Sequence, residues 1–289
     1  MISGVALVAK PGGPDGPTSH DVVDTVRRAV GTDRVGHLGT LDPCAAGLLV
    51  IVVGRATRLA PFAAGWAKAY DGVIRLGTTT ATDDATGATV ATSEAWRGVD
   101  RARVEEALAA FRGAYDQRPP AYSAVKVAGE RAYRRARRGE GVVLRPRRVE
   151  VTALELESFA PPDVGFRATV SGGTYLRSLA RDVGEALGCG AHLATLTRTR
   201  VGPFRLADAV APDGVTAHAL RDPAELVRDL PARELDDAGR AAVVHGRPVP
   251  VGDGARETGN VALFWSGQLV AVAERVGEVL KPRVVVVEQ

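Results

Sequence analysis

Several strands are indicated along the chain by runs and alternations of apolar residues. Residues 48–53 form an unbroken apolar run, which is typical of a buried strand. Residues 5–10 form a second short apolar segment, and residues 68–77, 147–159 and 166–170 also have strand-like patterns. We therefore expect five strands before residue 171, with the 48–53 strand inside the core.

Other segments carry apolar side chains at helical spacing. In the first, Val22, Val26 and Val30 share one face, Ser19 is suited to the N-cap, and Gly31 is suited to end the helix. Two further helices are predicted, one over residues 101–112 after an Asp100 cap, and one that has Tyr175 and Arg177 in its first turn and is closed by Gly188.

A domain boundary is predicted near Pro231, after a short helix over residues 223–230. Residues 1–230 and 231–289 are then expected to form separate domains. In the second of these, the pattern predicts a hairpin and a final strand, over residues 261–265, 269–276 and 282–287.

Composition places the chain among ordinary soluble globular proteins. Its 289 residues, 45% apolar and 25% charged, favour about two domains with a large core. The first ten residues lack the layout of a signal peptide, and no apolar run approaches the ~20 residues that span a membrane. With two cysteines and scattered histidines, we expect no disulfide, no metal site and a cytoplasmic location.

The charge is unevenly distributed. Between Arg118 and Arg148 there are ten Arg or Lys and two Glu, a net charge of +8, which leaves −5 for the rest of a chain whose total is +3. A basic segment on a mildly acidic protein is typical of polyanion binding, and a solvated Arg-rich helix is the competing interpretation. Tyr122 and Tyr133 lie within it, and cations interleaved with aromatic rings are suited to looped RNA.

The stretch before the 48–53 strand contains one carboxylate, Asp42. Pro43 disfavours helix at Asp42, and Gly36 and Gly39 allow sharp turns upstream. A carboxylate on a constrained loop beside a hydrophobic core is suited to act as a nucleophile. An ordinary Asp-Pro turn explains the same features.

This stretch resembles a known signature. Residues 36–43, Gly-His-Leu-Gly-Thr-Leu-Asp-Pro, are similar to the G-H-x-G-x-L-D-P motif of the bacterial tRNA pseudouridine-55 synthases, the B (TruB) family. Three further segments resemble the family's motifs in the same order: K-x-Y with L-G-x-x-T-x-T-x-D-x-x-G over 68–87, Q-x-P-P-x-x-S-A-x-K over 117–126, and G-T-Y-x-R-x-L-x-x-D-x-G with G-C-G-A-H-x-x-x-L-x-R over 173–198.

The resemblance implies the fold and the site. It implies an α+β protein, with a pseudouridine-synthase domain built on a mixed or antiparallel sheet flanked by helices, and a small barrel-like C-terminal PUA domain. The residues at about 118–148 would be a basic RNA-binding insertion. Asp42, Tyr70 and Arg177 would be the catalytic residues. The substrate-binding residues would be His37, Tyr175, Leu196, Lys10, Lys126, Arg134, Arg135, Arg137 and Arg138.

The function implied is the isomerisation of uridine 55 in the T-loop of tRNA to pseudouridine. The expected partner is the tRNA T-arm, and the expected enzyme is a monomer without cofactor, metal or obligate protein partner. Three alternatives stay open. They are an RNA-binding or tRNA-folding protein without chemistry, a guide-RNA-dependent pseudouridine synthase, and a glycosidase with a second carboxylate from Asp83 or Asp84.

Overall fold

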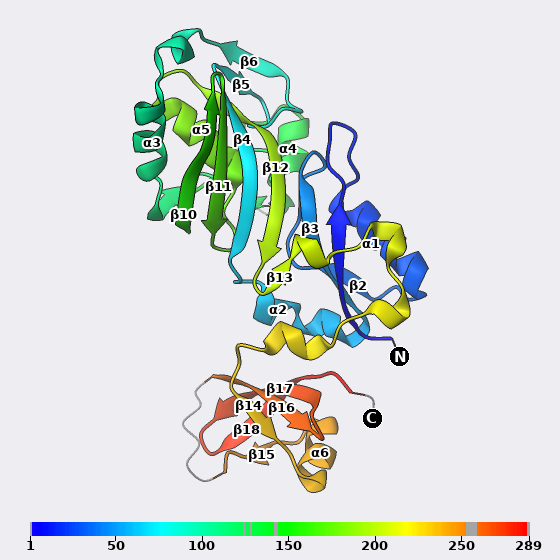
Figure 1. The fold of residues 1–289 in the computed structure, drawn as a ribbon. Coiled ribbons are helices and arrows are strands. Elements are labelled where there is room, and N and C mark those ends of the chain that lie inside the picture. The colour runs from blue at the N-terminus through cyan, green and yellow to red at the C-terminus, as the bar shows by residue number, and fades with distance from the viewer. Residues whose placement is uncertain (1, 124, 128, 142–143, 253–258, 288–289) are drawn as a thin grey trace.

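The computed structural model describes residues 2–123, 125–127, 129–141, 144–252 and 259–287, without the side chains of Lys126, Val127, Arg131 and Arg137. Its larger part is built on a mixed sheet (Figure 1). The strands of this sheet are β1 (Gly4–Lys10), β2 (Val35–His37), β3 (Ala46–Val53), β4 (Lys68–Leu76), β7 (Gly113–Gln117), β10 (Arg147–Ala160), β11 (Asp163–Val170), β12 (Ala191–Val201) and β13 (Phe204–Arg205).

Strands far apart in the sequence are neighbours in this sheet. The order is β1-β3-β12-β4-β11-β10-β7, with β2 also paired to β3 and β13 to β12. The β3–β12 pair is parallel, whereas β12 runs antiparallel to β4. The sheet therefore places the end of β12 beside the start of β3.

The predicted buried strand is β3, and it contributes to a core on each face of the sheet. Leu49, Ile51 and Val53 belong to one hydrophobic cluster, and Leu48 and Val50 belong to the other. Because side chains alternate along a strand, an entirely apolar sequence is required at a position covered on both sides.

Three helices cover the first face. They are α1 (Ser19–Val30), α3 (Arg101–Ala109) and α5 (Leu176–Ala186), and their apolar side chains lie in the same cluster as Ile51. The predicted helices are therefore present, although α3 ends at Ala109 and not at residue 112. Thr18, not Ser19, is the N-cap of α1, because Thr18 and Asp21 form a reciprocal capping box.

The second face is covered by short elements and by the C-terminal part of the chain. The short elements are η1 (Gly54–Leu59), α2 (Ala60–Ala63) and η6 (Pro223–Val227), the last lying within the helix predicted over 223–230. A five-stranded sheet follows, in the order β14-β16-β17-β18-β15. Its strands are β14 (Ala232–Glu234), β15 (Val249–Pro250), β16 (Asn260–Trp265), β17 (Gln268–Val276) and β18 (Val279–Val285), and the helix α6 (Asp237–Val244) follows β14 in the chain.

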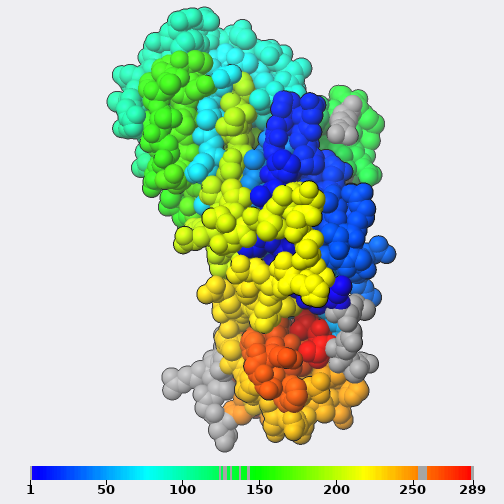
Figure 2. Space-filling model, turned by 45° about the vertical axis from the view of Figure 1, so that its right-hand side comes forward, coloured from blue at the N-terminus to red at the C-terminus, as the bar shows by residue number. Residues whose placement is uncertain are grey.

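The α+β class is confirmed, and the hairpin and last strand are where the pattern predicted them. The hydrophobic pattern did not predict α6, β14 and β15. Ala262, Leu269 and Val272 join Leu226 in the cluster beneath β3, and Figure 2 shows the orange and red segment against the yellow one. The boundary at residue 230 stays a prediction.

The basic segment leaves the sheet between two adjacent positions. Gln117 at the end of β7 pairs with Arg147 at the start of β10, so residues 118–146 form one excursion. It contains β8 (Lys126–Val127), β9 (Glu130–Arg131) and α4 (Ala132–Arg137). A second excursion carries the small hairpin β5 (Thr78–Thr80) and β6 (Thr89–Thr92). No helix within the described ranges is long and apolar enough to cross a membrane.

Candidate active site

Asp42 lies on the loop that joins β2 to β3, and it is paired with an arginine 135 positions later. The Nε atom of Arg177 is 2.9 Å from Asp42 Oδ2, and Nη2 donates to Oδ1 at 3.2 Å. The Asp42 side chain is 38% exposed whereas that of Arg177 is 7% exposed. The carboxylate therefore has an open side, while the guanidinium behind it is fixed.

Arg177 is the second residue of α5, and it connects three separate segments. Besides Asp42, its guanidinium donates to the carbonyl oxygens of Thr82 at 2.9 Å and Tyr122 at 3.0 Å. These bonds bring the β5–β6 excursion and the beginning of the basic excursion to the Asp42 loop. The structure thus assembles the site from all four sequence motifs.

Asp84 also contacts Arg177, so Asp42, Arg177 and Asp84 form a charged cluster, the Asp42 cluster. The sequence patterns gave Asp84 no role in the synthase. Its Oδ2 is 3.6 Å from Arg177 Nη1, and its side chain is 6% exposed. The hydroxyls of Thr82 and Thr86 each donate to Oδ1 at 2.6 Å. The only sequence signal was its place as the aspartate of the T-x-D-x-x-G segment.

Tyr70 and Leu196 come from the neighbouring strands β4 and β12. Tyr70 is 6% exposed and lies in the same cluster as Leu41 and Leu176, the chain neighbours of Asp42 and Arg177. Leu196 packs against that cluster and pairs with Gly72, two residues after Tyr70. An aromatic ring and an aliphatic side chain are suited to hold a flat base.

Tyr175 is held by an amide that the sequence analysis also did not assign. Gln117 is 1% exposed; its Oε1 accepts from the Tyr175 amide at 2.8 Å, and its Nε2 donates to the Tyr175 carbonyl at 3.1 Å. Tyr175 is the N-cap residue of α5 and is half-buried. The two hydrogen bonds of Gln117 with the Tyr175 backbone therefore fix the start of the helix that carries Arg177.

His37 ends β2 and is opposite Ile51 of β3. Burial lowers the pKa of its imidazole, and the positive charge of Arg198 lowers it further. A neutral ring at pH 7 follows, which suits a group that holds a nucleotide better than one that carries a proton. Its Nδ1 has no hydrogen-bond partner among the residues that the structure describes.

Lys10 is not available to the substrate, so its predicted role is corrected. It is 2% exposed, and its ammonium donates to the carbonyls of Pro11, Pro43 and Ala45 at 2.7 to 2.9 Å. Burial lowers the pKa of Lys10, partly opposed by Cys44 and Asp42. Lys10 holds the loop that carries the carboxylate.

Cys44 is a further titratable group close to Asp42. Burial raises the pKa of its thiol to about 11, with Asp84 and Asp42 adding to the effect. The protonated thiol is a poor nucleophile, so Asp42 remains the candidate. Within the described part of the chain, no cluster of three or more His, Cys, Asp or Glu is arranged to hold a metal ion.

The predicted RNA-binding arginines lie on α4 and just after it. Arg134 is exposed, whereas Arg135 pairs with Glu140, and Arg138 pairs with both Glu130 and Glu140. These pairs order the excursion without neutralising it. The side chains of Lys126 and Arg137 lie outside what the structure describes.

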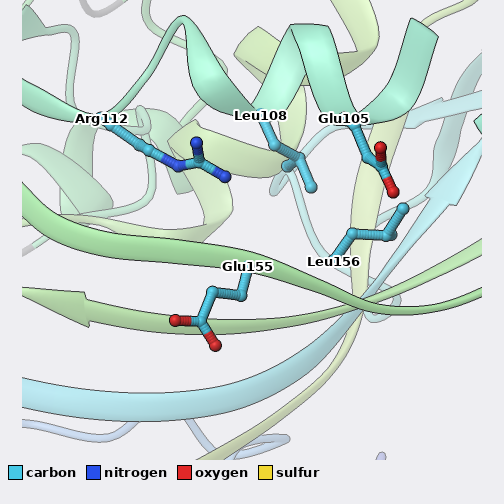
Figure 3. A pocket seen from close by; sticks show the side chains of 5 residues that line it. All are labelled: Glu105, Leu108, Arg112, Glu155 and Leu156. Carbon is cyan, nitrogen blue, oxygen red and sulfur yellow. The ribbon is translucent and has the colours of Figure 1, made fainter. Parts of the chain in front are cut away.

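A hollow of about 330 Å³ lies elsewhere, between α3 and β10 (Figure 3). It is lined by Glu105, Leu108, Arg112, Glu155 and Leu156, none of which belongs to the Asp42 cluster. Arg112 donates to the Leu154 carbonyl at 2.9 Å and so acts within the fold. We do not assign the active site to this hollow.

Comparisons with known proteins agree with the motifs. Residues 27–176 match the N-terminal domain of the TruB family of pseudouridylate synthases, and residues 177–238 match the C-terminal domain of tRNA pseudouridylate synthase B. The tRNA pseudouridine synthase B of Thermobifida fusca (strain YX) is 46% identical over 286 residues, 95% of each chain. That of Azoarcus sp. (strain BH72) is 39% identical over 296 residues, 100% of this chain and 96% of the relative.

Solved structures share the fold. A Cbf5-Nop10-Gar1 complex contains a chain with a TM-score of 0.74 and 28% identity, covering 99% of this chain and 85% of the other. An H/ACA RNP bound to a substrate RNA containing 2'-deoxyuridine gives a TM-score of 0.73 and 25% identity, covering 98% and 85%. Together with the Asp42–Arg177 cluster, these matches establish that the chain belongs to the TruB family of pseudouridylate synthases, which are isomerases.

Proposed function

We propose that this chain isomerises uridine 55 in the T-loop of tRNA to pseudouridine, with Asp42 as the catalytic carboxylate. The observation that carries the proposal is the Asp42–Arg177 pair, 2.9 Å apart, on a loop with the family's G-H-x-G-x-L-D-P sequence. Relatives named tRNA pseudouridine synthase B match nearly the whole chain, which supports tRNA as the substrate.

The reaction needs few groups. The bond from N1 of uracil to the ribose C1′ breaks, the base turns, and C5 joins C1′ while C5 loses a proton and N1 gains one. No electrons are exchanged with a cofactor, so the reaction requires no redox partner. Asp42 can start it by attacking C1′, by attacking C6 or by removing the C2′ proton. Each route requires an ionised carboxylate with an open face, which matches the 38% exposure of Asp42.

Tyr70 is proposed to stack on the base and to accept the C5 proton at the end of the reaction. Tyr70→Phe keeps the ring and removes the hydroxyl, so we expect the rate of C5 tritium release to fall by at least about 10-fold. The affinity for a T-arm transcript should stay within twofold of the wild type, whereas Tyr70→Leu should weaken it. Release at the wild-type rate by Tyr70→Phe would exclude this proton-accepting role.

The basic excursion is proposed to hold the T-loop while the target uridine is turned out of its stack, a step that takes a few kcal/mol. Neutralising Arg134, Arg135, Arg137 and Arg138 together should weaken T-arm binding by about 10-fold or more near 0.1 M salt. It should also flatten the plot of log affinity against log salt, because phosphate contacts release counterions.

Three exposed arginines on and before α3 provide a control for general charge loss: Arg97, Arg101 and Arg103. In Figure 1 α3 lies at the left edge of the sheet, and α4 lies away from it, to the right of β4. Replacing Arg97, Arg101 and Arg103 by glutamine should leave the slope of log affinity against log salt nearly unchanged. Equal slopes for the two variants would show that the basic excursion is not part of the RNA-binding surface.

Two competing functions remain to be tested against this one, an RNA-folding protein without chemistry and a guide-RNA-dependent synthase. The isolated protein should form pseudouridine in a bare T-arm transcript that has uridine at position 55, and none in a transcript with cytidine there. Binding without product would favour the RNA-folding protein. Product only after a guide RNA is added would favour the guided enzyme.

A further inference from the structure

The loop that carries Asp42 has all of its carbonyl groups occupied by donors. From Gly39 to Ala45, each of the seven carbonyl oxygens accepts a hydrogen bond of 2.7 to 3.4 Å. Two donors are backbone amides of Gly13 and Ala45. The other five bonds come from the side chains of Lys10, Ser19 and Arg198, which belong to β1, α1 and β12.

Arg198 is the most buried of these three side chains, at 1% exposure. Its Nη2 donates to Gly39 at 3.0 Å, its Nη1 to Thr40 at 3.4 Å and its Nε to Leu48 at 2.8 Å, all at carbonyl oxygens. Among the described residues it forms no ion pair with a carboxylate. A buried guanidinium whose acceptors in the described part of the chain are carbonyls, without a carboxylate, is costly to keep, so a function in ordering those carbonyls is expected.

The hydrogen bond between the Arg198 guanidinium and the Gly39 carbonyl depends on the residue type at both positions. Gly39 has a φ of 102°, which side chains disfavour, and a Cβ there would lie 3.3 Å from Lys68 Cε. The glycine therefore lets the backbone turn its carbonyl toward the guanidinium. Arg198 reaches both sides of the loop at once, from Gly39 to Leu48, because its donors form a fixed planar fork.

Ser19, at the start of α1, holds Leu41, the loop residue after Thr40. The Leu41 amide donates to its hydroxyl at 2.9 Å, and the hydroxyl donates to the Leu41 carbonyl at 2.9 Å. Ser19 is 3% exposed and is not the cap of its helix, so its hydroxyl is free for this exchange. Leu41 directly precedes Asp42, so the two bonds fix the direction of the carboxylate.

We propose that Arg198 and Ser19 are positioning residues for the reaction, acting on Asp42 through the backbone of residues 39–41. This inference rests on the proposed function, and it predicts that either residue changes the rate of the chemical step more than RNA binding or folding. A displacement of about 1 Å in a reacting group can lower a rate about 100-fold.

The test uses the full chain and a T-arm transcript tritiated at C5, at saturating protein in single turnover. Arg198→Met should slow tritium release by about 10- to 100-fold and Ser19→Ala by about 3- to 10-fold, with T-arm affinity within twofold of the wild type. Arg198→Lys should recover part of the rate. The double variant should lose less than the product of the two single losses, because both release the same loop.

Arg200→Met is the matched control, since Arg200 lies two residues along the same strand and, within the part of the chain that the structure describes, donates no side-chain hydrogen bond to the loop. If Arg198→Met does not fold, Ser19→Ala alone decides. Wild-type rates in Ser19→Ala and in folded Arg198→Met, or rates that fall only in proportion to folded protein or affinity, would overturn the inference. Absence of release by the wild type would instead refute the proposed function.

Discussion

Replacement of Asp42 by asparagine should abolish pseudouridine formation while leaving RNA binding nearly intact. The amide keeps the size of the side chain and can still accept from Arg177, but it cannot act as a nucleophile or base. The loss should be at least about 10⁴-fold, as for other removed nucleophiles. We would measure product by nucleoside chromatography after single turnover and affinity by filter binding.

A second aspartate provides the control for this substitution. Asp163 lies on β11 and pairs with Arg75 near the surface, where the two side chains are 36% and 50% exposed. Asp163→Asn should therefore keep the wild-type rate. If Asp42→Asn also retains more than a few per cent of that rate, Asp42 is a structural turn residue and another group performs the chemistry.

The replacement of Arg177 by methionine should have the second largest effect. It removes the ion pair with Asp42 and leaves Asp84, which is 6% exposed, without its cation. The carbonyls of Thr82 and Tyr122 lose their donor as well. We expect the single-turnover rate to fall by about 10²- to 10³-fold, since the reacting carboxylate is no longer oriented.

Stability should fall too, by about 1–3 kcal/mol, because buried polar groups are left unpaired. Arg177→Lys should lie between the wild type and methionine in both measurements, since an ammonium cannot reach all of these partners. Arg167→Met is the control, because Arg167 pairs with Asp71 and Glu157 at the surface, where the three side chains are 40% to 54% exposed. A wild-type rate in Arg177→Met would show that the pair is structural.

Sequence patterns were informative wherever one segment decides its own structure. The apolar run became β3 because it had no polar face to expose, and the caps at Asp100 and Gly31 ended up where predicted. The N-cap of α1 differed by one residue because Thr18 and Ser19 are both good capping residues. The hydroxyl of Ser19 instead donates to the carbonyl of Leu41, which lies 22 positions later in the chain.

The parts of the site that the sequence did not predict depend on long-range pairing. Arg198 reaches Leu48 across 150 positions because β12 lies parallel beside β3. Nothing in the local pattern around Arg198 specifies that neighbour. Asp84 and Gln117 stood within quoted motifs, but their roles required the fold to bring them to Arg177 and Tyr175.

Lys10 shows the converse, a residue whose surroundings differ from those that the resemblance implied. It was expected among the substrate-binding residues, yet its ammonium donates to three carbonyls of the fold. The carbonyls of the Asp42 loop take the charge, and the surface arginines of the basic excursion remain the candidates for the RNA backbone.

The measurement that tests the central claim most directly is tritium release from a T-arm transcript labelled at uridine C5. The wild type should release one tritium for each uridine at position 55, and Asp42→Asn should bind the same RNA with similar affinity and release none. Equal release by both proteins would contradict the assignment of Asp42. No release by either, with tight binding by both, would contradict the proposed reaction.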